Sequence, residues 1–136
     1  MKVVLDTNVF LVCISKRSKL HWVFDALLKG RYTLCVTTDI LAEYAEIIES
    51  HMGLLAADNA LGALENLPNI DFITTYFRFP FLKDPDDNKF VECAIAANAR
   101  FIVSHDSDFK VLKTINFPKV EVIDTNAFYK ELFPDV

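Results

Sequence analysis

The stretch KVVLDTN at residues 2–8 decides the fold of this 136-residue chain. Its apolar run stops at Asp6, and such a run is typical of a strand that is buried on both faces of a parallel sheet. The stretch FIVSHDSDF at residues 101–109 repeats the pattern, with a short apolar run that Asp106 soon follows. Similar apolar runs lie at residues 33–36, 70–74 and 120–123.

Segments with helical spacing of apolar residues separate these runs. We expect helices near residues 8–14, 18–29, 38–50, 54–66, 86–98, 106–113 and 125–133. Strands that alternate with helices favour right-handed βαβ units. The sequence therefore predicts an α/β fold, a three-layer α/β/α sandwich with a central parallel sheet of four to five strands, in a single domain over residues 1–136.

Composition narrows the class of protein. Apolar residues make up 52% of the chain and the net charge is −5, which argues against a broad basic surface for duplex binding. The three cysteines are an odd number without C-x-x-C spacing, so they predict neither a disulfide framework nor a zinc site. No apolar run approaches the ~20 residues of a membrane helix, and the first residues lack the pattern of a secretory leader. We therefore expect a cytoplasmic protein.

Two acids follow the buried strands directly, at the sheet edge where ligands bind in open α/β folds. Asp6 has an alternative role as a helix cap or Asx turn, although Asn8 is better placed to cap the predicted helix. Asp106 and Asp108 can likewise each either cap a helix or face the pocket. We expect Asp106 to face the pocket while Asp108 caps the helix or serves as an auxiliary ligand. Ser104 and Asn8 are auxiliary candidates that could orient a carboxylate or a water.

A third acid, Glu43, comes from the predicted helix at 38–50. At ~100° per residue, Ile40, Tyr44 and Ile47 form one apolar stripe, and Glu43 lies on its border. A carboxylate there would be partly desolvated. The alternative is an ordinary boundary glutamate that reaches solvent.

The fourth acid comes from the segment DPDD at residues 84–87. Asp84 suits the N-cap of a helix with Pro85 at its first position. Asp87 precedes Phe90 and Val91 by three and four residues and so points along the buried face. We therefore assign Asp87 to the pocket, and Asp84 remains the alternative for this position.

Convergence of these four acids would have an electrostatic consequence. Two carboxylates ~4 Å apart repel each other by roughly 4 kcal/mol at an effective dielectric constant of 20. A cluster of four must therefore take up protons or bind cations. Oxygen ligands select hard ions, so we expect one or two Mg²⁺ or Mn²⁺ ions.

Three motifs together resemble the PIN-domain family, in particular its toxins of bacterial toxin–antitoxin pairs. They are VVLDTNVF from residue 3, TTDILAEYAEII from residue 37 and DPDDNKFVECAIAANARFIVSHDSDF from residue 84. The resemblance implies a Mg²⁺- or Mn²⁺-dependent ribonuclease with an α/β/α fold. It also implies an RNA substrate, a small antitoxin partner and a homodimer or higher oligomer.

The same resemblance implies roles for individual residues. Matched by position, the family's acidic quartet corresponds to Asp6, Glu43, Asp87 and Asp106, which would be catalytic and metal-binding. Its polar helpers correspond to Asn8 and Ser104. His105 stands where the family varies, and its role stays open.

A basic cluster between two predicted helices and two basic side chains near the DPDD segment are candidates for RNA binding. They are Lys16, Arg17, Lys19, Arg78 and Lys83. The alternative is that they are ordinary solvated loop charges. Phe77, Phe79 and Phe81 surround Arg78 and would either stack on bases or cover a core edge or a dimer contact.

Two other functions compete with a ribonuclease. An aspartate-type phosphohydrolase would also place an acid after its first strand, but it requires a second Asp two residues on, where this chain has Asn8. A non-catalytic RNA-binding or regulatory module would keep the metal site for structure alone. Metal-dependent hydrolysis of RNA distinguishes the leading hypothesis from both.

Overall fold

The computed structural model, which describes residues 1–135, contains a five-stranded sheet in the order β3-β2-β1-β4-β5. Every neighbouring pair is parallel. The strands are β1 Lys2–Leu5, β2 Thr33–Val36, β3 Ile70–Phe72, β4 Phe101–Val103 and β5 Val122–Ile123. The predicted parallel α/β sheet is confirmed, and β3 and β5 are shorter than the apolar runs suggested.

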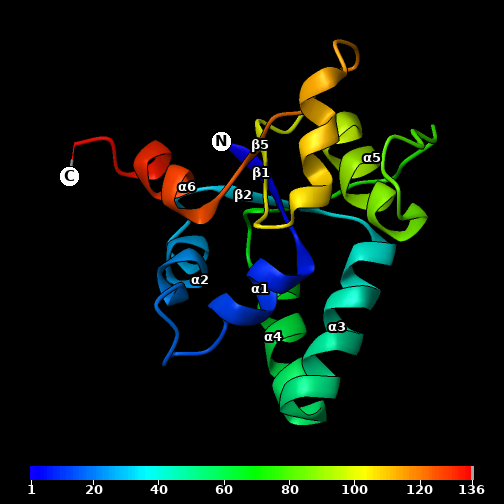
Figure 1. Cartoon of the computed structure of the whole chain (residues 1–136). Coiled ribbons are helices and arrows are strands. Elements are labelled where there is room, and N and C mark those ends of the chain that lie inside the picture. The colour runs from blue at the N-terminus through cyan, green and yellow to red at the C-terminus, as the bar shows by residue number, and fades with distance from the viewer. Residues whose placement is uncertain (136) are drawn as a thin grey trace.

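Helices cover both faces of the sheet. They are α1 Thr7–Cys13, α2 His21–Leu28, α3 Thr38–Met52, α4 Leu54–Asn66, α5 Asn88–Ala97 and α6 Thr125–Leu132, with 3₁₀ helices η1 Pro85–Asp87 and η2 Ser107–Thr114. In Figure 1 the α3–α4 hairpin and α1 lie on one side of the sheet, and α5 lies on the other. This arrangement is the predicted three-layer sandwich.

In the register of the central strands, β1 and β4 end at the same position along the sheet. Leu5 of β1 pairs with Val103 of β4, and both side chains are buried. The residues that follow, Asp6 and Ser104, therefore leave the sheet side by side. The run KVVL thus places the first acid against the segment that carries Asp106.

Two aromatic rings fix α1 and α3 against the end of β1. Phe10 of α1 stacks on Tyr44 of α3 with ring centroids 4.4 Å apart, and neither is exposed. The Tyr44 hydroxyl donates a hydrogen bond to the Leu5 carbonyl. Because Glu43 precedes Tyr44, this packing brings the Glu43 side chain to the same edge.

Two predicted α-helices begin or run as 3₁₀ helices. The helix expected at 86–98 starts as η1, and the helix expected at 106–113 is η2. In both places an aspartate caps with its own carboxylate: Asp84 accepts from the Asp86 N–H, and Asp106 accepts from the Asp108 N–H. Each of these side-chain bonds to the N–H two residues on forms an Asx turn at the start of the helix.

No helix within residues 1–135 has both the length and the apolar character to cross a membrane.

Candidate functional site

Asp6 lies at the carboxyl end of β1 and is only 7% exposed. The Ser104 hydroxyl donates a hydrogen bond of 2.8 Å to its Oδ2. Although α1 begins at Thr7, the Asp6 side chain does not cap that helix. The expectation that Asn8 caps it is wrong, because Asn8 lies inside α1, where its side chain is exposed.

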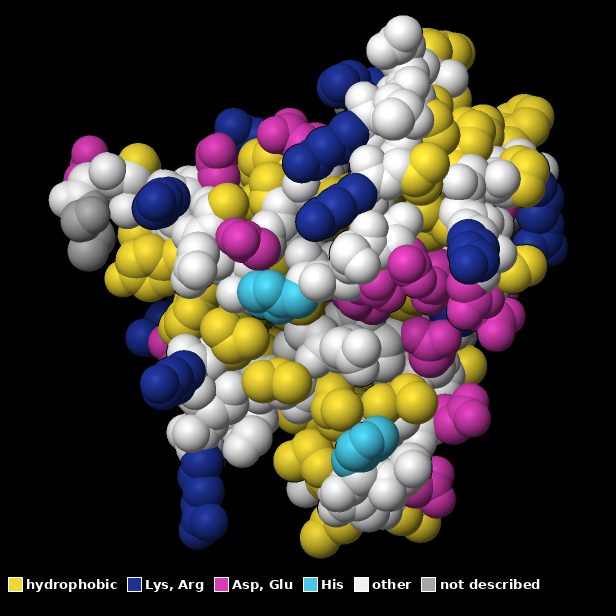
Figure 2. All heavy atoms as spheres, in the orientation of Figure 1, with side chains coloured by type: hydrophobic (Ala, Val, Ile, Leu, Met, Phe, Trp, Pro, Cys, Tyr) yellow, Lys and Arg dark blue, Asp and Glu magenta, His cyan; other side chains and the backbone are white. Residues whose placement is uncertain are grey.

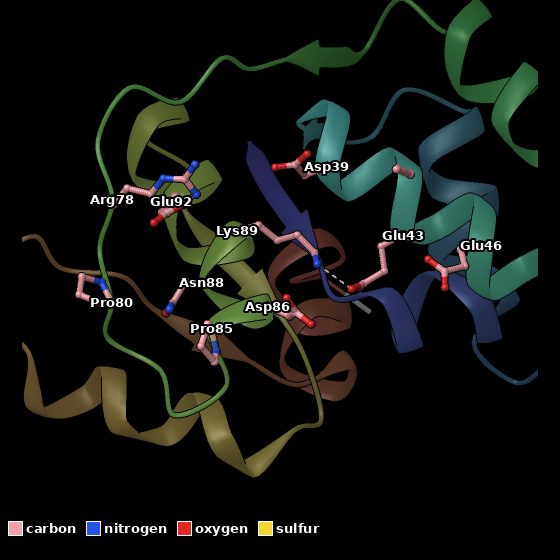
Figure 3. A pocket seen from close by; sticks show the side chains of 11 residues that line it. Asp39, Glu43, Glu46, Arg78, Pro80, Pro85, Asp86, Asn88, Lys89 and Glu92 are labelled. Atoms are coloured by element: carbon pink, nitrogen blue, oxygen red, sulfur yellow. Dashed lines mark ion pairs between the residues drawn. The ribbon is translucent and has the colours of Figure 1, made fainter.

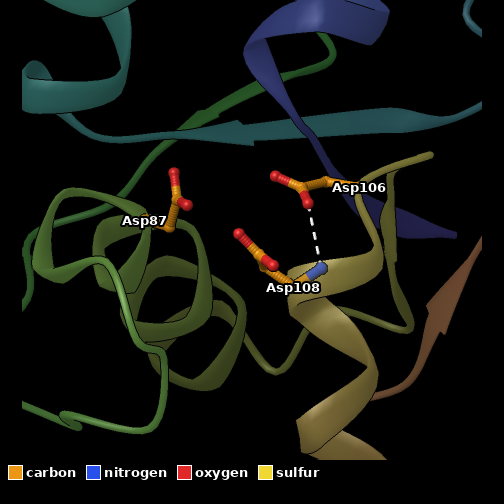
Figure 4. A group of neighbouring side chains, drawn as sticks. All are labelled: Asp87, Asp106 and Asp108. Carbon is orange, nitrogen blue, oxygen red and sulfur yellow. Dashed lines mark hydrogen bonds between the residues drawn. The ribbon is translucent and has the colours of Figure 1, made fainter.

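Asp87, Asp106 and Asp108 form a cluster, called here the acid cluster (Figure 4). Each offers a carboxylate oxygen, and these oxygens all lie within 4.8 Å of one another. Asp106 also caps η2, with its Oδ1 accepting from the Asp108 N–H at 2.9 Å. The cap therefore falls to Asp106, and the Asp108 side chain joins the cluster instead.

Glu43 has two partners of its own. The Thr7 hydroxyl donates to its Oε2, and the Lys89 Nζ lies 2.7 Å from its Oε1. Figure 3 shows Lys89 reaching from α5 toward Glu43 on α3. Both side chains are mostly buried, with 20% of Lys89 and 26% of Glu43 exposed. The charge of Glu43 is therefore balanced within the protein.

The acids influence one another electrostatically. Burial raises the pKa of Asp87 to about 6. The negative charges of Asp84, Asp6, Asp106 and Glu43 contribute to this raised pKa. Burial also raises the pKa of Asp6, against the opposing effect of the Ser104 hydrogen bond. The four predicted acids thus share one electrostatic environment.

The acid cluster fits a hard divalent cation. It offers carboxylate oxygens alone, the donor type that Mg²⁺ and Mn²⁺ prefer. Within residues 1–135, no lysine or arginine forms an ion pair with Asp87, Asp106 or Asp108. Mutual repulsion and partial burial already disfavour the charged form of Asp87, and a cation would remove that cost.

The other predicted residues lie at varied places. Asp84 turns its carboxylate to its own chain at Asp86. Arg78 is largely exposed, and its Nη1 lies 3.9 Å from Glu92. Together with Glu43, Arg78 lines a hollow of about 530 Å³ (Figure 3).

The remaining basic candidates are exposed on connecting segments. Lys16, Arg17 and Lys19 are exposed on the connection between α1 and α2, and Lys83 is exposed before η1. None of them lines the hollows that adjoin Asp6, Glu43 or Asp106.

Sequence reasoning missed three side chains that hold this region together. Thr7 and Lys89 contact Glu43, but they are far from it in the chain, so no local pattern pairs them. Glu92 is 6% exposed and accepts a hydrogen bond from the Phe79 N–H. A glutamate next to the buried face of the predicted helix at 86–98 was a usable signal. The Phe79 N–H that pairs with Glu92 could not be predicted, because the loop at 77–81 has no periodicity.

Comparisons with known proteins agree with this fold. A family model described as PIN domain matches residues 2–108, while no curated protein matches the chain. The chain resembles VapBC2 from Rickettsia felis, solved with a DNA fragment from its promoter, with 18% identity over 91% of this chain and 98% of that one and a TM-score of 0.63.

Two more solved structures share the fold. The Mycobacterium tuberculosis toxin VapC20, described as cleaving the sarcin-ricin loop, is 12% identical over 79% of this chain and 92% of its own, with a TM-score of 0.55. The PIN domain of human SMG5 is 15% identical over 96% of this chain and 99% of its own, with a TM-score of 0.54. At these identities the likeness shows the fold alone.

Proposed function

This chain belongs to the PIN-domain family, and on that premise we propose that it is a Mg²⁺- or Mn²⁺-dependent endoribonuclease. The observation that carries the proposal is the acid cluster at the carboxyl edge of the sheet. Its three carboxylates converge within 4.8 Å beside the buried Asp6, and they form no ion pair with a lysine or arginine in the described part of the chain. Such a site is suited to a divalent ion and a phosphate, both of which bring oxygen and charge.

In this proposal the acids have distinct tasks. Asp87, Asp106 and Asp108 hold the ion, and Asp6 completes the site from β1. Ser104 orients Asp6 by its hydrogen bond, and Asn8 faces the same hollow as Asp6. A bound divalent ion supplies an activated water at neutral pH and neutralises charge on the phosphoryl oxygens.

Glu43 is the fourth acid of the proposal. Thr7 and Lys89 hold its carboxylate in place, so that it faces the site as a fixed group. It acts by positioning water or phosphate rather than by holding a free cation.

A role as the toxin of a toxin–antitoxin pair is part of the same proposal. The solved structures of VapBC2 and VapC20 support it at the level of fold. A small antitoxin and a second copy of this chain are the proposed partners. Copurification with the product of a neighbouring small gene, and the mass of the free protein in solution, test these two partners.

Cleavage of RNA by the purified protein tests the activity. The assay uses a panel of structured and single-stranded RNAs with Mn²⁺, Mg²⁺ or EDTA. We expect cleavage with either metal and none with EDTA. Asp87→Asn should lose about 100-fold or more, and the adjacent Asp86→Asn, which keeps the same turn, is the matched control.

Three outcomes would contradict the proposal. Equal cleavage by wild type and Asp87→Asn, with equal melting temperatures, would show that the site is misplaced. Cleavage that persists in EDTA would remove the metal dependence. Stabilisation by Mg²⁺ without hydrolysis of any RNA would favour a non-catalytic module.

A further inference from the structure

A second hollow, of about 260 Å³, lies on the side of Asp106 toward η2 and β5. Its polar wall includes His105, Ser107, Lys110 and Lys113. We propose that this hollow binds the phosphate backbone of the RNA next to the cleaved bond. The inference rests on the proposed function, and it names where the substrate strand enters the site.

The 3₁₀ geometry of η2 creates the row of donors. A 3₁₀ helix has three residues per turn, so side chains at i and i+3 are aligned. Ser107, Lys110 and Lys113 are each three residues apart and therefore lie in one line, called here the lysine row. Phe109 and Leu112, also three apart, are buried on another face. In an α-helix, at about 100° per residue, the three polar side chains would instead fan out over about 120° of the surface.

The spacing of the row suits a nucleic acid strand. One turn of a 3₁₀ helix rises about 6 Å, close to the separation of successive phosphates along an extended strand. Lys110 and Lys113 can therefore meet neighbouring phosphates rather than compete for one. The Ser107 hydroxyl stands at the end of the row that adjoins Asp106.

The two lysines are free to bind an anion. Within residues 1–135 neither forms an ion pair. Two carboxylates share the hollow, Asp106 and Asp124. Asp124 turns one oxygen to the N–H of Ala127 and caps α6, and Asp106 belongs to the acid cluster. Figure 2 shows Lys and Arg side chains gathered beside the acidic side chains on this face.

His105 connects this hollow with the one that contains Asp6. The His105 Nε2 lies 2.9 Å from the hydroxyl of the buried Thr125, which holds the ring. His105 and Asp106 line both the lysine hollow and a hollow of about 360 Å³. The wall of the 360 Å³ hollow contains Asp6 and Asn8, together with the apolar side chains Val9, Val12 and Leu20.

These shared walls define a path for the substrate. A strand that leaves the lysine row crosses His105 and Asp106, beside the acid cluster. It then meets a hollow with polar groups for ribose or phosphate and an apolar surface for a base. An acidic protein segment would satisfy the lysines but would gain nothing from the adjacent carboxylates, so RNA is the favoured occupant.

RNA binding without cleavage tests this inference. Binding of a fluorescein-labelled single-stranded RNA is measured in EDTA by fluorescence anisotropy across a series of salt concentrations. Lys110→Gln/Lys113→Gln should weaken binding about ten-fold. It should also lower the slope of log affinity against log salt by about 1.4, because each phosphate contact contributes about 0.7 for a single strand.

Matched variants separate this site from general charge. Lys29→Gln/Lys130→Gln makes the same change of charge at exposed positions outside the hollow, and its slope should stay unchanged. Lys110→Arg/Lys113→Arg should keep the wild-type slope, because it keeps both charges. Melting temperatures confirm that each variant is folded.

Several results would overturn the inference. They are equal slopes for wild type and Lys110→Gln/Lys113→Gln, an equal loss in the Lys29→Gln/Lys130→Gln control, and failure of the wild type to bind RNA. Displacement by polyglutamate of equal charge, at the same concentration as unlabelled RNA, would instead indicate an acidic protein partner. Failure of the proposed function appears separately: the wild type would bind RNA through the lysine row but would not cleave it with Mn²⁺.

Discussion

The acidic site has two sides, and they differ in whether a protein cation balances the negative charge of the carboxylates. On one side Glu43 carries a protein cation, with Lys89 Nζ 2.7 Å from its carboxylate. On the other side Asp87, Asp106 and Asp108 converge, and no lysine or arginine of residues 1–135 pairs with them. In the proposed function the acid cluster therefore holds the ion, and Glu43 does not. If this assignment is right, changes on the two sides should have different effects on metal binding.

The largest effect should follow loss of one carboxylate from the acid cluster. In Asp106→Asn the side-chain oxygen can still accept from the Asp108 N–H and cap η2, so the fold should survive. The affinity for Mn²⁺ should fall about 100-fold, and stabilisation by the metal should fall with it. Isothermal titration and thermal melting with increasing Mn²⁺ measure both.

Asp86→Asn is again the control, since Asp86 lies outside the acid cluster. Equal loss in both variants would mean that Mn²⁺ responds to the general acidity of this face. Unchanged affinity in Asp106→Asn would remove Asp106 from the proposed ligands.

A change at Lys89 should act on the opposite side. Lys89→Met removes the cation beside Glu43 and leaves a mostly buried carboxylate without its partner. The metal-free protein should lose about 1–2 kcal/mol of unfolding free energy, because the pair is partly exposed. The number of Mn²⁺ ions bound should rise, since Glu43 becomes available to a second ion.

Lys83→Met is the matched control for this experiment, because Lys83 is exposed and outside every ion pair described. Urea unfolding in EDTA and the stoichiometry of Mn²⁺ binding are the measurements. An unchanged free energy together with unchanged stoichiometry would show that Lys89 does not substitute for a metal ion.

The dependence of stability on pH should reveal the cost of keeping Asp87 charged in the acid cluster. The pKa of Asp87 is raised to about 6 from 3.8, so the folded state holds this proton more tightly than the unfolded state does. Its contribution to stability is present below the unfolded pKa and is lost as the pH rises through about 6. Asp6, whose pKa is also raised, acts in the same direction.

The metal-free protein should therefore lose about 1 kcal/mol from Asp87 between pH 4 and pH 7, after allowance for solvent screening. Urea unfolding in EDTA across this range measures the loss, and Asp87→Asn should flatten it. Mn²⁺ at pH 7 should restore the stability. If the wild type and Asp87→Asn show the same dependence of stability on pH, ionisation of Asp87 does not destabilise the folded protein and the prediction is wrong.

Sequence alone predicted the sheet and the strand-end acids because each depends on a local pattern. The run that ends at Asp6 and the run that precedes Asp106 determine both the strands and the edge where the acids leave them. The side of the α3 helix that carries Glu43 followed from the helical period. These features need only neighbouring residues.

The electrostatic partners could not be predicted, because they depend on how separate elements pack. Lys89 meets Glu43 only because α5 packs against α3. The lysine row required knowing that η2 is a 3₁₀ helix, whereas its apolar spacing suggested an α-helix. Residue type alone also does not reveal that Asp106, and not Asp108, caps η2.

The smallest effect should come from the basic cluster on the connection between α1 and α2. Lys16, Arg17 and Lys19 were among the candidates for RNA binding by sequence, yet they line none of the hollows beside the acids. Exposed charges at a distance act through a screened field with a reach of about 10 Å at 0.1 M salt.

Replacing all three by Gln should therefore slow association at low salt by a few-fold and leave the affinity at 0.15 M salt within about two-fold. Stopped-flow and equilibrium anisotropy with the same labelled RNA measure the two effects. A loss of affinity as large as that of Lys110→Gln/Lys113→Gln would move the substrate path to this connection, because direct phosphate contacts, unlike steering, slow dissociation as well.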